Sequence, residues 1–207
     1  MIWLAWLGAS YLLGAFPTSF VAGKVGRGID LREHGSKNLG ATNVFRILGW
    51  KYAIPVALID VAKGGAPVAL FGPWSGLGGG WAAAFGAAAV LGHVFSPFVG
   101  FKGGKGVATA AGMFLALAPV AVAIALPVWG LCLWLTGYVS LSSIAAAVTF
   151  PVWVLLTAPA SPPAFYASLG LAALIVFSHR ANIRRLVAGT ENRFRTRKEI
   201  HALPASS

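Results

Sequence analysis

The chain opens with MIWLAWLGASYLLGAFPTSFVA (residues 1–22), a stretch without a single charged side chain. The first charged residues, Lys24 and Arg27, follow this apolar run. A cleavable signal peptide has the opposite order, with positive residues first and a small-residue cleavage site at its end. Twenty helical residues span about 30 Å, which is the thickness of the hydrocarbon core of a bilayer. The run therefore predicts a retained transmembrane helix.

The composition of the whole chain supports the same conclusion. Of the 207 residues, 57% are hydrophobic and 10% are charged, whereas soluble domains carry about 25% charged residues. So few charges cannot cover a water-facing surface, which excludes an ordinary soluble globule and a disordered protein. We predict an all-α integral membrane protein that forms a single polytopic domain over residues 1–207.

The balance of charge limits the classes of molecule that the protein can bind. Sixteen Lys and Arg against five Asp and Glu give a net charge of +11. Such a balance suits nucleic acid, a membrane surface or an anionic substrate, and the hydropathy argues against nucleic acid. The acidic residues are too few and too scattered for a metal site, which needs several convergent carboxylates. We expect a lipid bilayer and anionic small molecules as partners, and no metal.

The charged residues gather in three segments, 23–51, 92–109 and 178–199, and only Asp60 and Lys63 lie outside them. Positively charged loops stay in the cytoplasm, so we expect all three segments there, the N-terminus outside and the C-terminus inside. The expected spans are residues 1–22, 48–71, 78–99, 107–126, 127–141, 143–158 and 164–180. The stretch 107–158 also fits one crossing with a re-entrant pair, so five spans are the alternative to seven.

The first segment contains the run Gly35 to Arg46, with two Asn, two Gly, a Ser and a Thr. A solvated positive loop explains its cations but not these neutral groups. They supply hydrogen-bond donors and a pliable backbone, which a polar ligand requires. The candidate site residues here are Ser36, Asn38, Asn43 and Arg46.

The second segment contains Phe101-Lys102-Gly103-Gly104-Lys105-Gly106-Val107-Ala108-Thr109, shortly after His93. Glycines allow successive amide N–H groups to point at one anion, and a following helix adds the positive end of its dipole. We therefore predict a phosphate cradle made by Gly103, Gly104, Lys105, Gly106 and Thr109, with His93 as a further candidate. The spacing of a nucleotide-binding P-loop is absent.

A third constellation and two weaker features complete the candidates. His179, Asn182 and Arg185 are three apart, so on one helix they would share a face. Ser143 falls near a predicted cytosolic helix end. Asp60 and Lys63 are also three apart, within the second expected span. Charges at mid-bilayer are costly, and the pair is either a structural ion pair facing the bundle or a functional one.

The stretches Ser36–Arg46, Gly92–Thr109 and Ser178–Arg193 resemble the three cytoplasmic motifs of the bacterial membrane acyltransferase family that uses acyl phosphate and glycerol 3-phosphate. They occur in the order and spacing of that family. The resemblance implies transfer of a fatty acyl group from acyl phosphate to position 1 of sn-glycerol 3-phosphate, which yields lysophosphatidate and phosphate. It also implies a multi-pass protein of the cytoplasmic (inner) membrane, with its active site facing the cytoplasm, in the first step of phospholipid synthesis.

The same resemblance implies roles for individual residues. Ser36 and Arg46 match active-site positions of the first motif, and Gly103 to Gly106 with Lys105 match the glycerol 3-phosphate site. His179 and Asn182 match critical positions of the third motif, and Glu191 a structural one. Acyl phosphate is an activated mixed anhydride, so the reaction needs no metal and no cofactor.

A different class, a small transporter or flippase for an anionic lipid or metabolite, is the alternative. Transporters place their polar residues near mid-membrane in broken helices. Here the polar residues collect in the loops of one face, and only Asp60 and Lys63 lie deep. A Mg²⁺-dependent head-group transferase is excluded by the shortage of acidic residues.

Overall fold

The computed structural model describes residues 1–194, and within that range the regular secondary structure is entirely helical. The prediction of an all-α protein is confirmed. The elements are α1 (Ile2–Ala15), α2 (Thr18–Arg27), α3 (Ala41–Leu48), α4 (Trp50–Ala66), the π-helical η1 (Pro67–Phe71), α5 (Gly72–Ser75), α6 (Gly79–Val94), the 3-10 helix η2 (Pro97–Val99), α7 (Val107–Leu117), α8 (Pro119–Thr136), α9 (Val139–Thr157), α10 (Pro162–Ser178) and α11 (Arg180–Val187).

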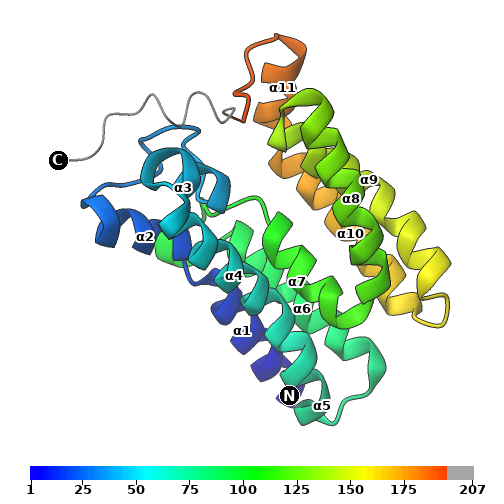
Figure 1. Ribbon diagram of the computed structural model, residues 1–207. Helices are drawn as coiled ribbons and strands as arrows, with labels where there is room; N and C mark the ends of the chain where they lie inside the picture. The colour runs from blue at the N-terminus through cyan, green and yellow to red at the C-terminus, as the bar shows by residue number, and fades with distance from the viewer. Residues whose placement is uncertain (195–207) are drawn as a thin grey trace.

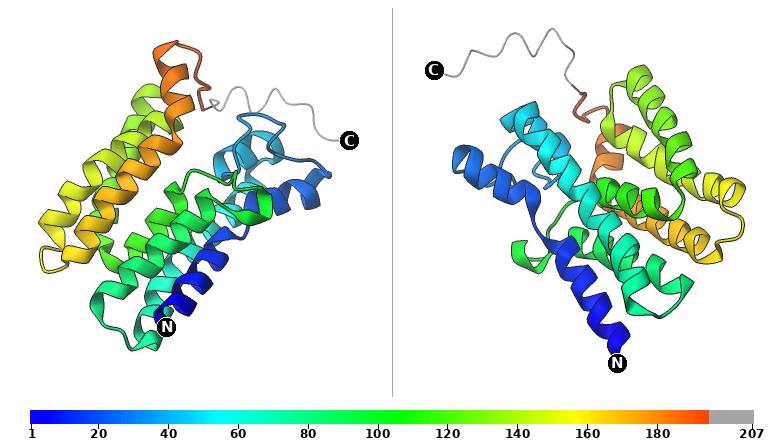
Figure 2. Two further views of the ribbon diagram at one scale, coloured as in Figure 1. Left: turned by 180° about the vertical axis from the view of Figure 1, so that it is seen from behind. Right: turned by 60° about the horizontal axis from the view of Figure 1, so that its bottom comes forward.

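The long helices form two layers (Figures 1 and 2). In the first layer α1 packs on α6 and α4 packs on α7, and in the second α9 lies between α8 and α10. Glycines bring the helices of the first layer into close contact. A Cβ atom on Gly64 would lie 1.9 Å from the carbonyl oxygen of Thr109, and one on Gly92 would lie 2.0 Å from that of Tyr11. Lipid provides no hydrophobic driving force between helices, so their association depends on close packing, which small residues at the contacts permit.

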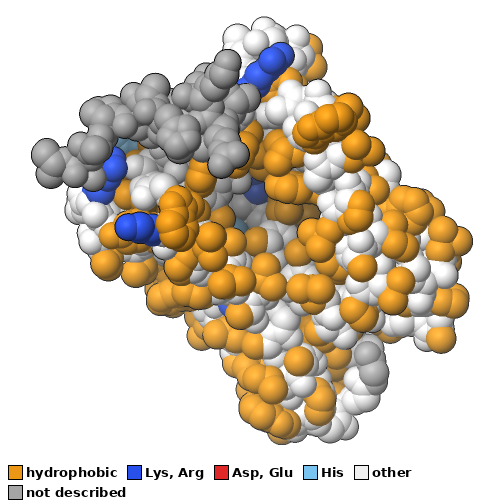
Figure 3. Space-filling model, in the orientation of Figure 1, with side chains coloured by type: hydrophobic (Ala, Val, Ile, Leu, Met, Phe, Trp, Pro, Cys, Tyr) orange, Lys and Arg blue, Asp and Glu red, His pale blue; other side chains and the backbone are white. Residues whose placement is uncertain are grey.

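Five helical stretches are long and apolar enough to cross a membrane: Ile2–Arg27, Trp50–Ser75, Gly80–Val99, Pro119–Thr136 and Val139–Thr157. A sixth results if α10 and α11, which are bent by 57°, count as one span. Helix α7 is apolar but has only 11 residues. Hydrophobic side chains make up much of the surface of the bundle on the face that Figure 3 shows. The prediction of a multi-span integral membrane protein is therefore confirmed.

Several predicted span boundaries are wrong. The chain turns at Ala118, which ends α7, and at Gly137, which has a φ of 74° and ends α8, not at residues 126 and 142. Pro127 and Pro151 lie inside α8 and α9, as membrane helices allow when neighbouring groups satisfy the freed carbonyls. The first run is also not one helix, because it breaks between Ala15 and Thr18.

The two ends of the bundle differ. Helices α2, α3 and α11 lie at one end, and the N-terminus, α5 and the connection between α9 and α10 lie at the other (Figures 1 and 2). The three basic segments thus meet at a single end. The part of the third segment beyond residue 194, including Glu199, lies outside the described residues.

Candidate functional site

A polar pocket of about 250 Å³ lies where the three basic segments meet. Five of the side chains that line it are Lys or Arg, and no Asp or Glu is among its described lining. Such a pocket attracts an anion. The lining residues are Ser36, Lys37, Asn38, Lys105, Ser178, Arg180, Ala181, Asn182, Arg184 and Arg185.

Glu191 lies outside the lining and holds two of the lining residues, Asn182 and Arg185, in place. Its Oε1 atom accepts hydrogen bonds from Asn182 Nδ2 at 2.6 Å and from Ser140 Oγ at 2.8 Å, and its Oε2 atom accepts one from Arg185 Nε at 2.7 Å. Burial alone would raise the pKa of this carboxyl group. The hydrogen bonds from Asn182, Ser140 and Arg185 outweigh burial, and they hold the pKa below its usual value. Glu191 is therefore a charged brace that joins α9, α11 and the segment after α11.

Lys105 is the cation at the centre of the network, and its Nζ donates a hydrogen bond to Asn182 Oδ1. Partial burial lowers the pKa of this ammonium group to about 8; the charge of Glu191 opposes that shift, and Arg185 and Arg46 add to it. The protein thus does not fully compensate the charge of Lys105. An incoming anion would do so, because an opposite charge at close range favours the ammonium form.

The glycine-rich turn differs from the expected cradle. The Gly103 N–H donates to the carbonyl of Val94 at 3.0 Å, and the Gly104 N–H donates to that of His93 at 3.1 Å. A Cβ atom on Gly104 would lie 2.1 Å from His93 Nε2, and one on Gly103 would lie 2.0 Å from the His93 carbonyl oxygen. The prediction that these two amides point at an anion is wrong. These glycines instead let the turn pack against the end of α6, which leaves the Lys105 side chain to face the pocket.

Gly106 and Thr109 serve the packing of α7 rather than the lining of the polar pocket. Gly106 caps α7 with a φ of 82°, a left-handed conformation that favours glycine. Thr109 has no exposed surface, and its carbonyl packs against Gly64 of α4. The predicted place of Thr109 in the cradle is wrong, because its side chain lies in the α4–α7 contact and not in the lining of the pocket.

Residues of the first motif divide between the pocket and its support. Ser36 and Asn38 line the pocket. Asn43 is 1% exposed, and it accepts the Ser36 N–H at 2.9 Å and donates to the carbonyls of Leu31 and His34. Asn43 is therefore a brace of the loop and not a ligand group. Arg46 is not among the lining residues, but its charge acts on Lys105, and it donates to the carbonyl of Asn192 at 3.4 Å.

His179 occupies the bend between α10 and α11 and is 2% exposed. Its Nδ1 lies 2.8 Å from the carbonyl oxygen of Ile175. A carbonyl only accepts hydrogen bonds, so in the neutral ring Nδ1 carries the hydrogen and Nε2 is the acceptor. The sequence predicted that His179, Asn182 and Arg185 share one face of a helix. In the structure Asn182 and Arg185 lie on α11 and both bond Glu191, whereas His179 lies at the bend that precedes α11.

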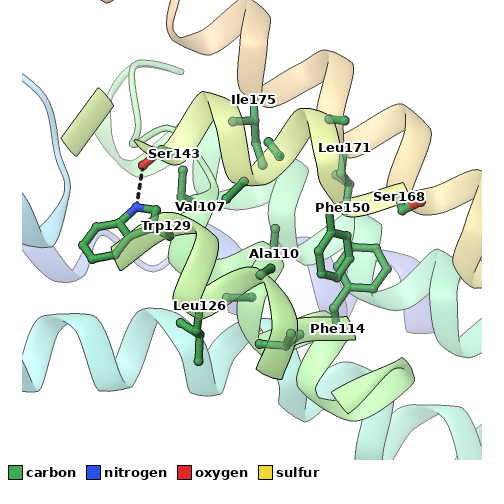
Figure 4. Close-up of a pocket in the computed structure, with 16 residues that line it drawn as sticks. Val107, Ala110, Phe114, Leu126, Trp129, Ser143, Phe150, Ser168, Leu171 and Ile175 are labelled. Atoms are coloured by element: carbon green, nitrogen blue, oxygen red, sulfur yellow. Dashed lines mark hydrogen bonds between the residues drawn. The ribbon is translucent and has the colours of Figure 1, made fainter. Parts of the chain in front are cut away.

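An apolar pocket of about 110 Å³ lies between α7, α8, α9 and α10 (Figure 4). Ser143 lies in its wall, where it accepts a hydrogen bond from Trp129 Nε1 at 3.2 Å. The rings of Phe114 and Phe150, with centroids 4.6 Å apart, line it as well. The candidate Ser143 thus belongs to this pocket and not to the polar one.

The remaining candidates, Asp60, Lys63 and His93, lie below the glycine turn rather than in either large pocket. Asp60 and Lys63 form a buried ion pair, with Oδ1 and Nζ 2.8 Å apart. A structural ion pair was one of the two alternatives that the sequence left open. In the described part of the chain, no three His, Cys, Asp or Glu side chains converge as a metal site requires.

Sequence reasoning missed Ser140, Arg180 and Arg184 as site residues. Ser140 holds Glu191 across two helices, and such a contact depends on tertiary packing. Arg180 and Arg184 line the polar pocket. Their place within a basic, His- and Asn-containing stretch was the available signal.

The chain is similar over most of its length to known glycerol-3-phosphate acyltransferases. A family model described as glycerol-3-phosphate acyltransferase matches residues 4–189. A relative from Trichlorobacter lovleyi named glycerol-3-phosphate acyltransferase is 47% identical over 193 residues, with 93% of this chain and 97% of the relative covered. One of the same name from Chlorobium luteolum is 41% identical over 227 residues, with 93% and 97% covered.

Two solved structures have the same fold. Both are crystal structures of PlsY (YgiH), described as an integral membrane glycerol 3-phosphate acyltransferase. The glycerol 3-phosphate form has a TM-score of 0.88 and 39% sequence identity, and the lysophosphatidic acid form has a TM-score of 0.85 and 38% identity. Each comparison covers 96% of this chain and 98% of the other.

Proposed function

The chain belongs to the glycerol-3-phosphate acyltransferase family, and on that premise we propose that it acylates the 1-hydroxyl of sn-glycerol 3-phosphate with acyl phosphate as the donor. The products are lysophosphatidate and phosphate. The transporter alternative has no support from the family, and the cationic pocket is lined by residues of the three charged segments rather than by residues of the membrane-spanning helices' middle parts.

One observation carries the proposal: residues that line the apolar pocket are joined by short links to residues in or beside the cationic pocket. Val107 lines the apolar pocket and is two residues from Lys105, which lines the polar one. Ile175 lines the apolar pocket, and its carbonyl accepts the hydrogen bond from His179. An acyl phosphate has a charged head and an aliphatic tail, so it requires two such environments side by side.

The residues in and beside the pocket have different roles in the proposed reaction. Lys105 neutralises phosphate charge, with Arg46 beside it. Asn182 holds the Lys105 ammonium and is itself fixed by Glu191. Ser36 and Asn38 offer neutral hydrogen bonds from the opposite wall. His179, with Nε2 as an acceptor, orients the attacking hydroxyl group.

The chemistry requires one proton transfer. The glycerol O1 atom attacks the carbonyl carbon of acyl phosphate, the carbon–oxygen bond to the phosphate breaks, and phosphate leaves. The hydroxyl proton passes to an oxygen of the departing phosphate, which is already next to the reacting carbon. Preorganised cations stabilise the negative charge that develops, and no cofactor takes part.

The donor and the need for metal are tested together. Purified protein in detergent is mixed with radiolabelled glycerol 3-phosphate and either palmitoyl phosphate or palmitoyl-CoA, with excess EDTA. We expect lysophosphatidate from palmitoyl phosphate alone, at a rate that EDTA does not change. Product from palmitoyl-CoA alone, or an EDTA block that Mg²⁺ relieves, would contradict the proposal.

The pKa of Lys105 gives a pH dependence. With a pKa of about 8, the ammonium is present below pH 8 and is lost above it. We therefore expect kcat/KM for glycerol 3-phosphate to fall above about pH 8, by about tenfold per pH unit, because this ratio reports the ionisation of the free enzyme. Lys105→Arg keeps its charge, so its alkaline limb should begin at higher pH. A wild-type profile that stays flat to pH 9.5 would contradict this assignment.

A larger side chain in the apolar pocket tests the acyl-chain site. Ala146 lines the pocket, and Ala145 of the same helix does not. Overpacking costs about 1–3 kcal/mol, so Ala146→Leu should lower kcat/KM for palmitoyl phosphate by about tenfold. The values for octanoyl phosphate and for glycerol 3-phosphate should change less than about twofold. Ala145→Leu is the matched control, and an equal loss in both variants would contradict the acyl-chain site.

We also propose the topology. The protein is a single polytopic domain of the bacterial cytoplasmic membrane, with seven passes that include the short α7, the N-terminus outside and the C-terminus in the cytoplasm. The gathering of the basic segments at one end supports this orientation through the positive-inside rule, and it directs the polar pocket to the cytoplasm.

A further inference from the structure

A buried polar cluster lies where α2, α4 and α6 approach the glycine turn. Asp60 is 2% exposed, Lys63 5% and His93 8%. The Asp60 Oδ1 atom accepts a hydrogen bond from Thr18 Oγ1 at 2.9 Å, lies 2.8 Å from Lys63 Nζ and lies 3.8 Å from His93 Nδ1. Asp60 is therefore the centre of the cluster.

Lys63 connects the cluster to the break in the first transmembrane segment. Its Nζ donates to the carbonyl of Phe16 at 2.9 Å. The next residue, Pro17, has no N–H group, and the carbonyls at a helix end lack helical partners. The Phe16 carbonyl accepts hydrogen bonds from both the Thr18 N–H and the Lys63 ammonium, and the latter ties the break to α4.

His93 connects the cluster to the glycine turn. Its ring lies against Gly104, where any Cβ would meet Nε2, and its carbonyl accepts the Gly104 N–H. The residue that follows is Lys105, whose Nζ reaches Asn182 in the polar pocket. A continuous set of contacts therefore runs from Asp60 through His93 and Gly104 to Lys105.

We propose that Asp60, Lys63 and His93 are positioning residues, which hold the Gly103–Gly104 turn so that the Lys105 ammonium meets the substrate phosphate. Burying an ion pair seldom adds net stability, because desolvation offsets the attraction. The pair is better explained by the geometry that it fixes. The inference rests on the proposed function, because it assigns Lys105 to glycerol 3-phosphate.

The decisive variant is the double substitution Asp60→Asn/Lys63→Met. It removes both charges at nearly constant volume, so no unpaired charge is left in the interior and the protein should fold. A displaced Lys105 weakens phosphate binding, so we expect KM for glycerol 3-phosphate to rise about tenfold, as small misplacements at a site do. The value of kcat should change less than threefold and the melting temperature should not fall. His93→Phe, which keeps a ring under Gly104, should act in the same direction.

A double-mutant cycle separates positioning from general loosening. In a Lys105→Met background, the Asp60→Asn/Lys63→Met change should alter kcat/KM less than twofold, because the group that it positions is gone. Ser10→Ala is the control, since Ser10 is buried in α1 and bonds only the carbonyl of Trp6 among the contacts described. It should leave KM unchanged.

The outcomes are distinct. Folded variants with wild-type KM would overturn the proposal. So would an Asp60→Asn/Lys63→Met change that lowers kcat/KM by the same factor in the Lys105→Met background as in the wild type. Failure of both the double variant and His93→Phe to fold would assign the cluster to folding and overturn it as well. The wild-type protein is assayed alongside, and a wild-type protein without acyl transfer would instead contradict the proposed function.

Discussion

Lys105→Met should lower kcat/KM for glycerol 3-phosphate by at least about 30-fold, with most of the loss in KM. Methionine keeps the length of the side chain and removes its charge. Leaving one member of a desolvated charge pair without its partner costs about 2–5 kcal/mol, and 1.36 kcal/mol is a factor of ten. Steady-state kinetics with saturating palmitoyl phosphate measures the change.

The same substitution should not destabilise the protein. A lysine whose pKa is lowered to about 8 has its charged form disfavoured in the folded state, so removing the charge should leave the melting temperature unchanged or raise it. Lys102→Met is the control, because Lys102 is exposed and outside the lining of the pocket. An equal loss in Lys102→Met, or a variant of Lys105 with near wild-type KM, would show that Lys105 does not bind the phosphate.

The class of fold and the three site segments could be predicted from the sequence because each depends on composition or on local order. The apolar run at residues 1–22 determines membrane insertion, and the clustering of Lys and Arg marks the three segments that meet at the polar pocket. The positions of the turns between the helices were harder to predict. Pro127 has the same local signal as Pro119, but Pro119 begins α8 and Pro127 lies within it. Only the packing of neighbouring helices decides which proline ends a helix.

The contacts within the site could not be predicted, because they join residues far apart in the chain. Lys105 and Asn182 were both expected at the site, but their hydrogen bond spans 77 positions. The glycines show the same limit. The sequence Gly103-Gly104 suits either exposed amides or close packing, and only the position of the His93 ring selects packing.

His179 gives the second large effect, and two substitutions distinguish its possible roles. The Ile175 carbonyl holds Nδ1–H, which leaves Nε2 to accept a hydrogen bond from the glycerol hydroxyl. Glutamine at this position offers an amide oxygen that can accept the same bond, but it cannot take up a proton. If the leaving phosphate is the base, His179→Gln should retain at least about ten times more kcat than His179→Ala, since a lost orienting bond costs about 1.5 kcal/mol or more.

A general base behaves differently, because its loss costs about 10²–10⁴ in rate whatever replaces it. Equal and complete loss in His179→Gln and His179→Ala, with normal melting temperature and normal binding of glycerol 3-phosphate, would make His179 the base. The geometry favours the orienting role. Within the described residues, the Nδ1 partner of His179 is a neutral carbonyl rather than a carboxylate, and the neighbouring pocket lining is cationic. Burial of the ring and the charge of Lys105 disfavour the imidazolium that a general base must become, and the hydrogen bond to the Ile175 carbonyl offsets them only in part.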